Sequence, residues 1–394
     1  MKKFVWLACL IYCLNGFGHI IIGTVLEPMV QSYGIHYSDG GQLIMNQFLG
    51  FLVGVLFAPA IVKFIGRRKT IFLSLLSFAV VQILFGLQLD WTINLIAAPF
   101  SGAGIGITET IIAATIIAFL KEKKASTLVL AEVFFGVGAL IIPIVSSVLI
   151  ALGKWQMSFI FVAVAVSIVM VLWTILSFDE MEDVLKKQPQ IEKDEKKQRP
   201  TYKKKHMPII LVGATFFFMY VGTEMVLPNY LPTILSHTTN LSESSLALSI
   251  TVFWLAMTIG RMMMTFIIDH IGYHRLFILS CIGQLFALIL FALSPSIVLS
   301  YIAIFVTGIL MGGIFSIGLL IINETMVGME EWTTSLLVAL GGFGGAILPK
   351  IIGVFLDRYT IQTVLWTIVL FALSLVILMS AIYYFRKNMI EENI

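Results

Sequence analysis

The stretch FDEMEDVLKKQPQIEKDEKKQRPTYKKKH (178–206) decides the architecture, because it is the one long hydrophilic interval in an otherwise apolar chain. Of the 394 residues, 59% are hydrophobic and only 12% are charged, against about 25% charged in a soluble domain. Six long apolar segments precede the stretch and six follow it. A helix of about 20 apolar residues spans a bilayer, so these segments predict twelve crossings of a membrane.

Backbone chemistry in lipid favours helices for these segments. Every amide must find a partner within the protein, which leaves α-helices or closed barrels, and the runs lack the strict alternation of strands. We therefore predict an all-α membrane protein with twelve transmembrane helices in two six-helix halves. The N-terminal half covers 1–178, the cytoplasmic central loop 179–207 and the C-terminal half 208–394. The first segment is long and carries Asn15 and His19, which favours a retained helix over a cleaved signal peptide.

The lysines and arginines orient the chain. If the N-terminus is cytoplasmic, 21 of the 25 lysines and arginines fall on the cytoplasmic side. Lys154, Lys350 and Arg358 lie on the opposite side, and Arg261 lies inside the eighth segment. Such asymmetry is the positive-inside pattern. We expect both termini to be cytoplasmic and the protein to be integral to a bacterial-type plasma membrane.

Acidic residues inside the spans are candidates for function. Glu109 lies in ITETIIAATIIAFLKEKK (107–124), where an acid costs about 2.5–3.5 kcal/mol to insert. Glu132 lies at comparable depth in the next span, so the two acids could meet and share a proton. With His19, whose imidazole can titrate near neutral pH, they are the predicted proton-coupling residues. A protonated Glu109 bonded to a neighbouring helix, and a neutral structural His19, remain alternatives.

Polar groups elsewhere in the spans are candidate substrate contacts. Glu224, Asn229 and Tyr230 lie in the seventh span around Pro228 and Pro232, and these prolines are expected to interrupt the helix and line a cavity. The first half adds three amides, which can replace the water contacts of sugar hydroxyls or link helices. These amides are Asn15, Asn46 and Gln47.

Two short motifs recur at equivalent points of the halves: KFIGRRKT (63–70) and IIDHIGYHR (267–275). Both resemble the cytoplasmic signature of the major facilitator superfamily. Gly66, Arg67 and Arg68 match its basic end, Lys63 stands where an acidic residue is usual, and the second copy keeps the acid as Asp269. The resemblance implies a gating role for these residues, and Arg261 is a further gating candidate.

Four longer blocks resemble the fucose:proton symporter family and its bacterial glucose and mannose permease relatives. The blocks are TETIIAATIIAF (108–119), LAEVFFGVGAL (130–140), YVGTEMVLPNYLPTIL (220–235) and FWLAMTIGR (253–261). The resemblance implies a functional glutamate at Glu109 and places Glu132 where the family has a glutamine. The family's first-helix aspartate falls near Thr24.

These observations predict a secondary transporter, not an enzyme. The chain has no GxxxxGK[ST] loop for ATP. We expect proton-coupled movement of a small hydroxylated solute, such as a sugar, by alternating access. The alternative is proton-driven efflux of hydrophobic drugs, and a channel or sensor fits less well. The expected partners are the small-molecule substrate, protons and the lipid bilayer, with no nucleic acid, cofactor or metal, and the protein is expected to be a monomer.

Overall fold

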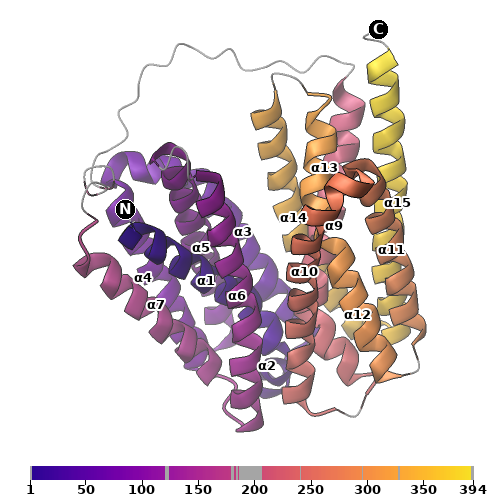
Figure 1. Ribbon diagram of the computed structural model, residues 1–394. Coiled ribbons are helices and arrows are strands. Elements are labelled where there is room, and N and C mark those ends of the chain that lie inside the picture. Colours follow the sequence, from indigo (N-terminus) through magenta and orange to yellow (C-terminus); the bar gives the residue numbers. More distant parts are fainter. Residues whose placement is uncertain are drawn as a thin grey trace. The chain divides into compact units, whose positions relative to one another are not determined.

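The computed structural model describes residues 2–119, 124–178, 182, 185, 206–239, 241–294, 296–326 and 329–391. Within these ranges every regular element is a helix (Figure 1). The helices are α1 (Lys2–Thr24), α2 (Leu26–Tyr33), α3 (Tyr37–Ile65), α4 (Arg67–Gly86), α5 (Trp91–Phe119), α6 (Lys124–Ala151), α7 (Met157–Ile175), α9 (Met207–Ser236), α10 (Glu243–Ile271), α11 (Tyr273–Leu293), α12 (Ile297–Met311), α13 (Ile314–Asn323), α14 (Glu330–Arg358) and α15 (Ile361–Glu391).

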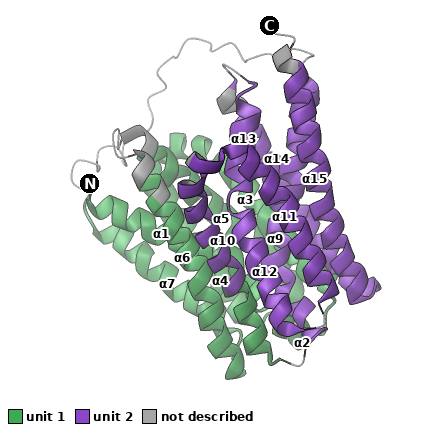
Figure 2. Cartoon of the chain, turned by 45° about the vertical axis from the view of Figure 1, so that its right-hand side comes forward, with its two compact units in different colours: residues 1–195, 240–251 green, residues 196–239, 252–394 purple. Residues whose placement is uncertain are grey.

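Twelve helical spans in the described part of the chain are long and apolar enough to cross a membrane, with α12 and α13 together forming one of them. The predicted fold class is thereby confirmed. The chain divides into two compact units (Figure 2). Unit 1 comprises residues 1–195 and 240–251, and unit 2 comprises residues 196–239 and 252–394, so α10 begins in unit 1 and continues in unit 2.

Glycines set the helix pairs of unit 1. A methyl group at Gly102 of α5 would collide with the main-chain oxygen of Gln47 on α3, and one at Gly138 of α6 would collide with that of Cys13 on α1. Only a residue without Cβ lets two backbones approach so closely. The pairs α3 with α5 and α1 with α6 are therefore fixed by small residues.

Glycines also set the helix pairs of unit 2. A methyl group at Gly344 of α14 would collide with the main-chain oxygen of Phe218 on α9, and one at Gly260 of α10 would collide with that of Ile309 on α12. These pairs bring together the first and fifth spans of the unit, and its second and fourth, as in unit 1. The halves of the sequence thus share one packing rule.

The first span does not end as a single helix. α1 stops at Thr24, Val25 has φ −107° and ψ 12°, and α2 continues from Leu26. Pro28 has no N–H to bond to the Thr24 carbonyl, which explains the break at this place. The Thr24 hydroxyl donates to the Ile20 carbonyl at 2.9 Å, so it is used within its own helix.

The expected interruption of the seventh span is wrong. α9 runs from Met207 to Ser236 straight through Pro228 and Pro232. Each proline removes one backbone donor, which frees the carbonyls of Glu224 and Pro228, yet the helix continues because its other backbone bonds and its packing hold it.

The break in unit 2 instead lies in the tenth span, which the sequence reading takes as continuous. α12 ends at Met311, Gly312 and Gly313 follow, and α13 begins at Ile314. Gly312 packs against the backbone of Arg261, so the two glycines permit both the break and the close approach.

Candidate functional site

Two polar side chains, from α6 and α1 of unit 1, interact with Glu109 on α5. Glu109 lies on α5 and is half-buried, whereas Glu132 lies on α6 and is exposed. The two carboxylates act electrostatically on each other, and both act on the hydroxyl of Tyr12 on α1. That hydroxyl donates a 3.5 Å hydrogen bond to the main-chain carbonyl of Glu109. The two acids of the predicted pair thus lie within electrostatic range of each other and of a phenol.

Tyr12 is a site residue that sequence reasoning missed. The signal was present, because Tyr12, Asn15 and His19 recur at the spacing that places residues on one face of a helix. Tyr12 is buried, with 2% of its surface exposed, so its ring packs in the core while its hydroxyl reaches Glu109. A phenol hydroxyl in that position can donate a hydrogen bond to a carbonyl or accept one from a protonated group.

Asn15 is completely buried beside the same helix. The Thr108 hydroxyl lies 3.3 Å from its Oδ1, which joins α1 to α5 one residue before Glu109. Its Nδ2 has no hydrogen-bond partner among the described residues. A buried amide N–H without a partner costs about 1–3 kcal/mol, so a water or solute hydroxyl at this atom would be stabilising.

His19 lies in an aromatic environment. Its ring is surrounded by those of Phe48, Phe51 and Phe135, with centroids at 5.4, 5.2 and 5.6 Å. Phenylalanine rings offer contact area but no hydrogen bond to a proton-carrying nitrogen. This geometry favours a packed imidazole over a relay, and the predicted coupling role of His19 remains a proposal.

The amides of the second span link helices. Asn46 donates to the Leu95 carbonyl at 3.0 Å and accepts from Gln42 at 2.7 Å. Gln47 donates to the Gly18 carbonyl at 2.9 Å and is 3% exposed. Their N–H donors therefore join α3 to α5 and to α1, and the structure does not place either amide among the contacts of Glu109.

Unit 2 holds its buried acid differently. Glu224 on α9 lies 3.5 Å from the guanidinium of Arg261 on α10. The Glu224 side chain is 8% exposed and that of Arg261 is 43% exposed. The ion pair therefore joins a buried carboxylate to a partly exposed guanidinium. The same guanidinium nitrogen lies 3.5 Å from the Met257 sulfur. Two residues predicted for separate roles thus form one ion pair.

The other predicted contacts of the seventh span are buried. The Asn229 amide is used on the Met225 carbonyl of its own helix, and 2% of the residue is exposed. Tyr230 is fully buried and its hydroxyl has no hydrogen-bond partner within the described residues, although the charge of Asp357 acts on it. Their predicted role as substrate contacts is not tested by this geometry.

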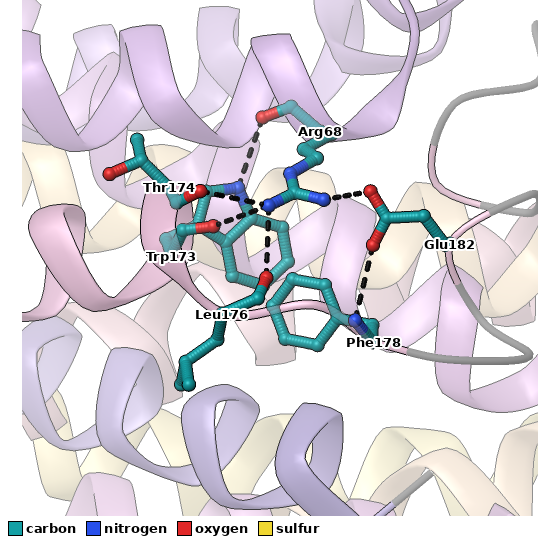
Figure 3. Close-up of polar contacts among 6 residues, drawn as sticks. All are labelled: Arg68, Trp173, Thr174, Leu176, Phe178 and Glu182. Carbon is teal, nitrogen blue, oxygen red and sulfur yellow. Dashed lines mark hydrogen bonds and ion pairs between the residues drawn. The ribbon is translucent and has the colours of Figure 1, made fainter.

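The basic motif after the third helix forms a capping network (Figure 3). The Arg68 guanidinium donates to three carbonyls at the C-terminal end of α7, at 3.3, 3.0 and 2.9 Å, those of Trp173, Thr174 and Leu176. It also pairs with Glu182 and lies 5.3 Å from the Phe178 ring centroid. A cation at a helix C-terminus satisfies free carbonyls and complements the helix dipole.

The other predicted gating residues of the two motifs are Gly66, Arg67 and Asp269. Gly66 has φ 80°, a conformation that side chains disfavour, and it forms the turn between α3 and α4. Arg67 is half-buried at the start of α4. The side chain of Asp269 lies outside the described residues, so its predicted gating role stays a prediction.

Chemically, unit 1 offers two like-charged carboxylates that act electrostatically on each other and on the Tyr12 hydroxyl, and a buried Asn15 amide on the helix that carries Tyr12. Unit 2 offers a carboxylate compensated by a guanidinium. No group of three or more His, Cys, Asp or Glu side chains in the described part of the chain could hold a metal ion.

Comparison with known proteins gives consistent matches. Residues 8–329 match the family described as the Major Facilitator Superfamily. The chain is 27% identical to the glucose/mannose transporter GlcP of Bacillus subtilis (strain 168), with 96% of this chain and 94% of that protein covered. It is 25% identical to a glucose/galactose transporter of Brucella abortus biovar 1 (strain 9-941), with 90% and 87% covered.

Among solved structures, the chain resembles that of a D-xylose-proton symporter with a TM-score of 0.77. The alignment covers 96% of this chain and 97% of that one at 12% sequence identity. At this identity the likeness concerns the fold alone.

Proposed function

The chain belongs to the Major Facilitator Superfamily, and from that premise we propose that it imports a monosaccharide together with a proton. It is an integral membrane protein, and members of this superfamily are transporters, not enzymes. Two relatives that match over most of its length are named as glucose/mannose and glucose/galactose transporters. These names support a hexose as the solute.

The observation that carries the proton part of the proposal is the juxtaposition of Glu109 and Glu132. Two carboxylates in a membrane-spanning unit repel each other, and one proton relieves that repulsion. Binding a proton therefore changes the charge of the site from two negative charges to one. A site that differs in charge between loaded and empty states can couple proton entry to a change of conformation.

The neighbours of the acid pair support a solute contact at the same place in unit 1. Among the described residues the Asn15 Nδ2 donor has no hydrogen-bond partner, and the Tyr12 hydroxyl makes a long bond of 3.5 Å. A sugar hydroxyl could accept from the amide and exchange a hydrogen bond with the phenol. In this proposal Asn15 and Tyr12 bind the solute, Glu109 and Glu132 carry the proton, and both termini face the cytoplasm.

Reconstituted protein tests the proposal. Liposomes containing the full chain should take up radiolabelled D-glucose, D-mannose or D-galactose above the equilibrium level when the outside is acidic. A protonophore should abolish that excess while leaving equilibrium uptake. Accumulation that ignores the pH gradient would refute proton coupling, and no uptake of any of the three hexoses would refute the substrate class.

The two alternative functions, drug efflux and a channel, predict different experimental results. Stabilisation by lipophilic cations, but by no hexose, in a thermal-shift screen would favour drug efflux, because a ligand that binds the folded state raises its apparent stability. A current that grows with the gradient without saturating would favour a channel. Saturable, proton-dependent hexose uptake excludes both.

A further inference from the structure

A cavity lies at one end of unit 1, beside the turn that joins α3 to α4. Its volume is about 260 Å³, and its walls come from the last turns of α3, the start of α4 and the C-terminal third of α5. Most of the lining is apolar, from Pro59, Val62, Ile111 and Ala114. Lys63 and Arg67 also line it, so two positive charges stand over an apolar wall.

The sequence places the Lys63 and Arg67 charges on the two sides of one turn. Lys63 is in the last turn of α3, Gly66 makes the turn, and Arg67 opens α4. Both helices are membrane spans, so the turn between them lies at a membrane surface. Lys63 and Arg67 therefore place two cations at one membrane-surface turn.

The surroundings of the cavity are apolar and exposed. Leu56 is 71%, Phe57 57% and Phe64 76% exposed, all on α3 within seven residues of Lys63. Large exposed apolar side chains on a membrane span are suited to contact with hydrocarbon. The cationic end of the cavity therefore lies where an apolar helix surface meets the polar headgroup region, the place to which lysine and arginine side chains extend.

We propose that this cavity binds the headgroup of an anionic phospholipid. The Arg67 guanidinium presents a planar fork of donors that matches phosphate oxygens, and the Lys63 ammonium adds a second charge. The apolar wall receives the glycerol and the first methylene groups of the acyl chains. Basic pockets between membrane helices recognise anionic headgroups in this way.

Two other occupants suit the cavity less. A neutral sugar would gain nothing from two cations and would face a wall with few hydrogen-bonding groups. The Thr110 hydroxyl, the other polar group in the lining, already donates to the Gly106 carbonyl at 2.7 Å. A free phosphate would use the cations but leave the apolar wall uncovered, whereas a phospholipid uses both.

Lipid titration of the detergent-purified full chain tests the proposal. Short-chain phosphatidylglycerol should raise the apparent melting temperature and remain bound in native mass spectra. Phosphatidylcholine with the same acyl chains, and inorganic phosphate at the same concentration, should do neither. Each juxtamembrane cation contributes about 1 kcal/mol, so Lys63→Gln should weaken phosphatidylglycerol binding about five-fold.

Variants of the motif separate this site from general surface charge. Lys69→Gln removes an exposed lysine from the same helix start that does not line the cavity, and it should leave the affinity unchanged. Lys63→Arg keeps the charge and should bind as wild type, which keeps the test available if Lys63→Gln does not fold. Equal losses for Lys63→Gln and Lys69→Gln, or equal stabilisation by inorganic phosphate and phosphatidylglycerol, would overturn the proposal.

Discussion

Glu109 and Glu224 are both acids in apolar helices, one in each unit, and the charges beside them are opposite. The electrostatic neighbour of Glu109 is another carboxylate, Glu132, whereas that of Glu224 is the Arg261 guanidinium. A like charge makes an added proton stabilising, and an opposite charge compensates the carboxylate without one. The two units therefore share a packing rule but differ in the chemistry that the acids within their spans can perform.

The largest predicted effect tests the packing that the units share. Gly102→Ala and Gly344→Ala each place a methyl group against a main-chain oxygen of the neighbouring helix, and backbone cannot move aside as a side chain can. We expect each to destabilise its unit by about 3 kcal/mol or more, at the upper end of overpacking costs. Size-exclusion chromatography of the detergent extract should show little monodisperse protein.

A matched control exists for this experiment in unit 2. The nearest atom to a methyl group at Gly341 is the Val221 Cγ2, at 2.8 Å, in a side chain that can adjust. Gly341→Ala should therefore yield more folded protein than Gly344→Ala. Equal yields for the three glycine variants would mean that close backbone approach does not hold the helix pairs.

A second prediction compares two arginine–carboxylate contacts that involve neither Glu109 nor Glu224. Arg68 serves three carbonyls, Glu182 and the Phe178 ring, whereas Arg386 donates to Glu324 at 2.9 Å, which also accepts from Tyr273. We expect Arg68→Ala to cost about 2–3 kcal/mol and Arg386→Ala less than about 1 kcal/mol.

Thermal unfolding in detergent measures the difference, and Arg68→Lys refines it. Lysine keeps the charge but lacks the planar fork that reaches several carbonyls at once, so we expect an intermediate loss. If Arg68→Ala and Arg386→Ala lower the melting temperature equally, the network in Figure 3 does not stabilise unit 1 as its geometry indicates.

The third prediction concerns the acids themselves. If one proton accompanies each sugar, a gradient of one pH unit supports about tenfold accumulation, because one unit corresponds to 1.36 kcal/mol. Glu109→Gln should reduce the accumulation ratio to about one while sugar exchange without a gradient persists. Glu224→Gln should retain accumulation, since its carboxylate is compensated by Arg261.

Proteoliposome uptake and counterflow, at matched protein content, separate these outcomes. Accumulation by Glu109→Gln would remove the acid pair from the mechanism. Loss of accumulation in Glu224→Gln, with exchange intact, would show that the units do not differ in the way their charges indicate.

The last prediction, also of a small effect, concerns the ion pair of unit 2. Arg261→Met leaves the Glu224 carboxylate, 8% exposed, without its guanidinium. The contact is 3.5 Å long and the arginine is 43% exposed, so we expect a loss of about 1 kcal/mol, the upper limit for exposed pairs. The double variant Glu224→Gln with Arg261→Met should recover part of the loss in thermal unfolding, and additive losses would show that the two residues do not interact.

Several local features were accessible from the sequence, and the reasons are physical. Hydropathy identifies spans because lipid excludes unpaired backbone, and Gly66 marks a turn because few side chains tolerate its φ of 80°. The effect of Pro228 and Pro232 was predicted wrongly, because propensity describes an isolated helix. In the fold α9 stays continuous, while Gly312 and Gly313 interrupt the tenth span beside Arg261.

The site was predicted in part. Depth along a helix follows from 1.5 Å per residue, which suggested that Glu109 and Glu132 could meet. The neighbours of an acid depend on how each helix is rotated, and a sequence alone gives no such rotation. The spacing of Tyr12, Asn15 and His19 indicated a shared helix face, but the contact of Tyr12 with Glu109, the burial of Tyr230 and the use of the Gln47 amide on the Gly18 carbonyl depend on this rotation.

The sequence by itself determined that this is a helical membrane protein with twelve spans, two comparable halves and rare acids in the spans, because the bilayer penalises every polar group that is left unpaired. Only the tertiary structure decided which charge stands beside each acid. Glu132 acts on Glu109 and Arg261 pairs with Glu224 because of how the helices of each unit pack, and an electrostatic interaction depends on the resulting distance.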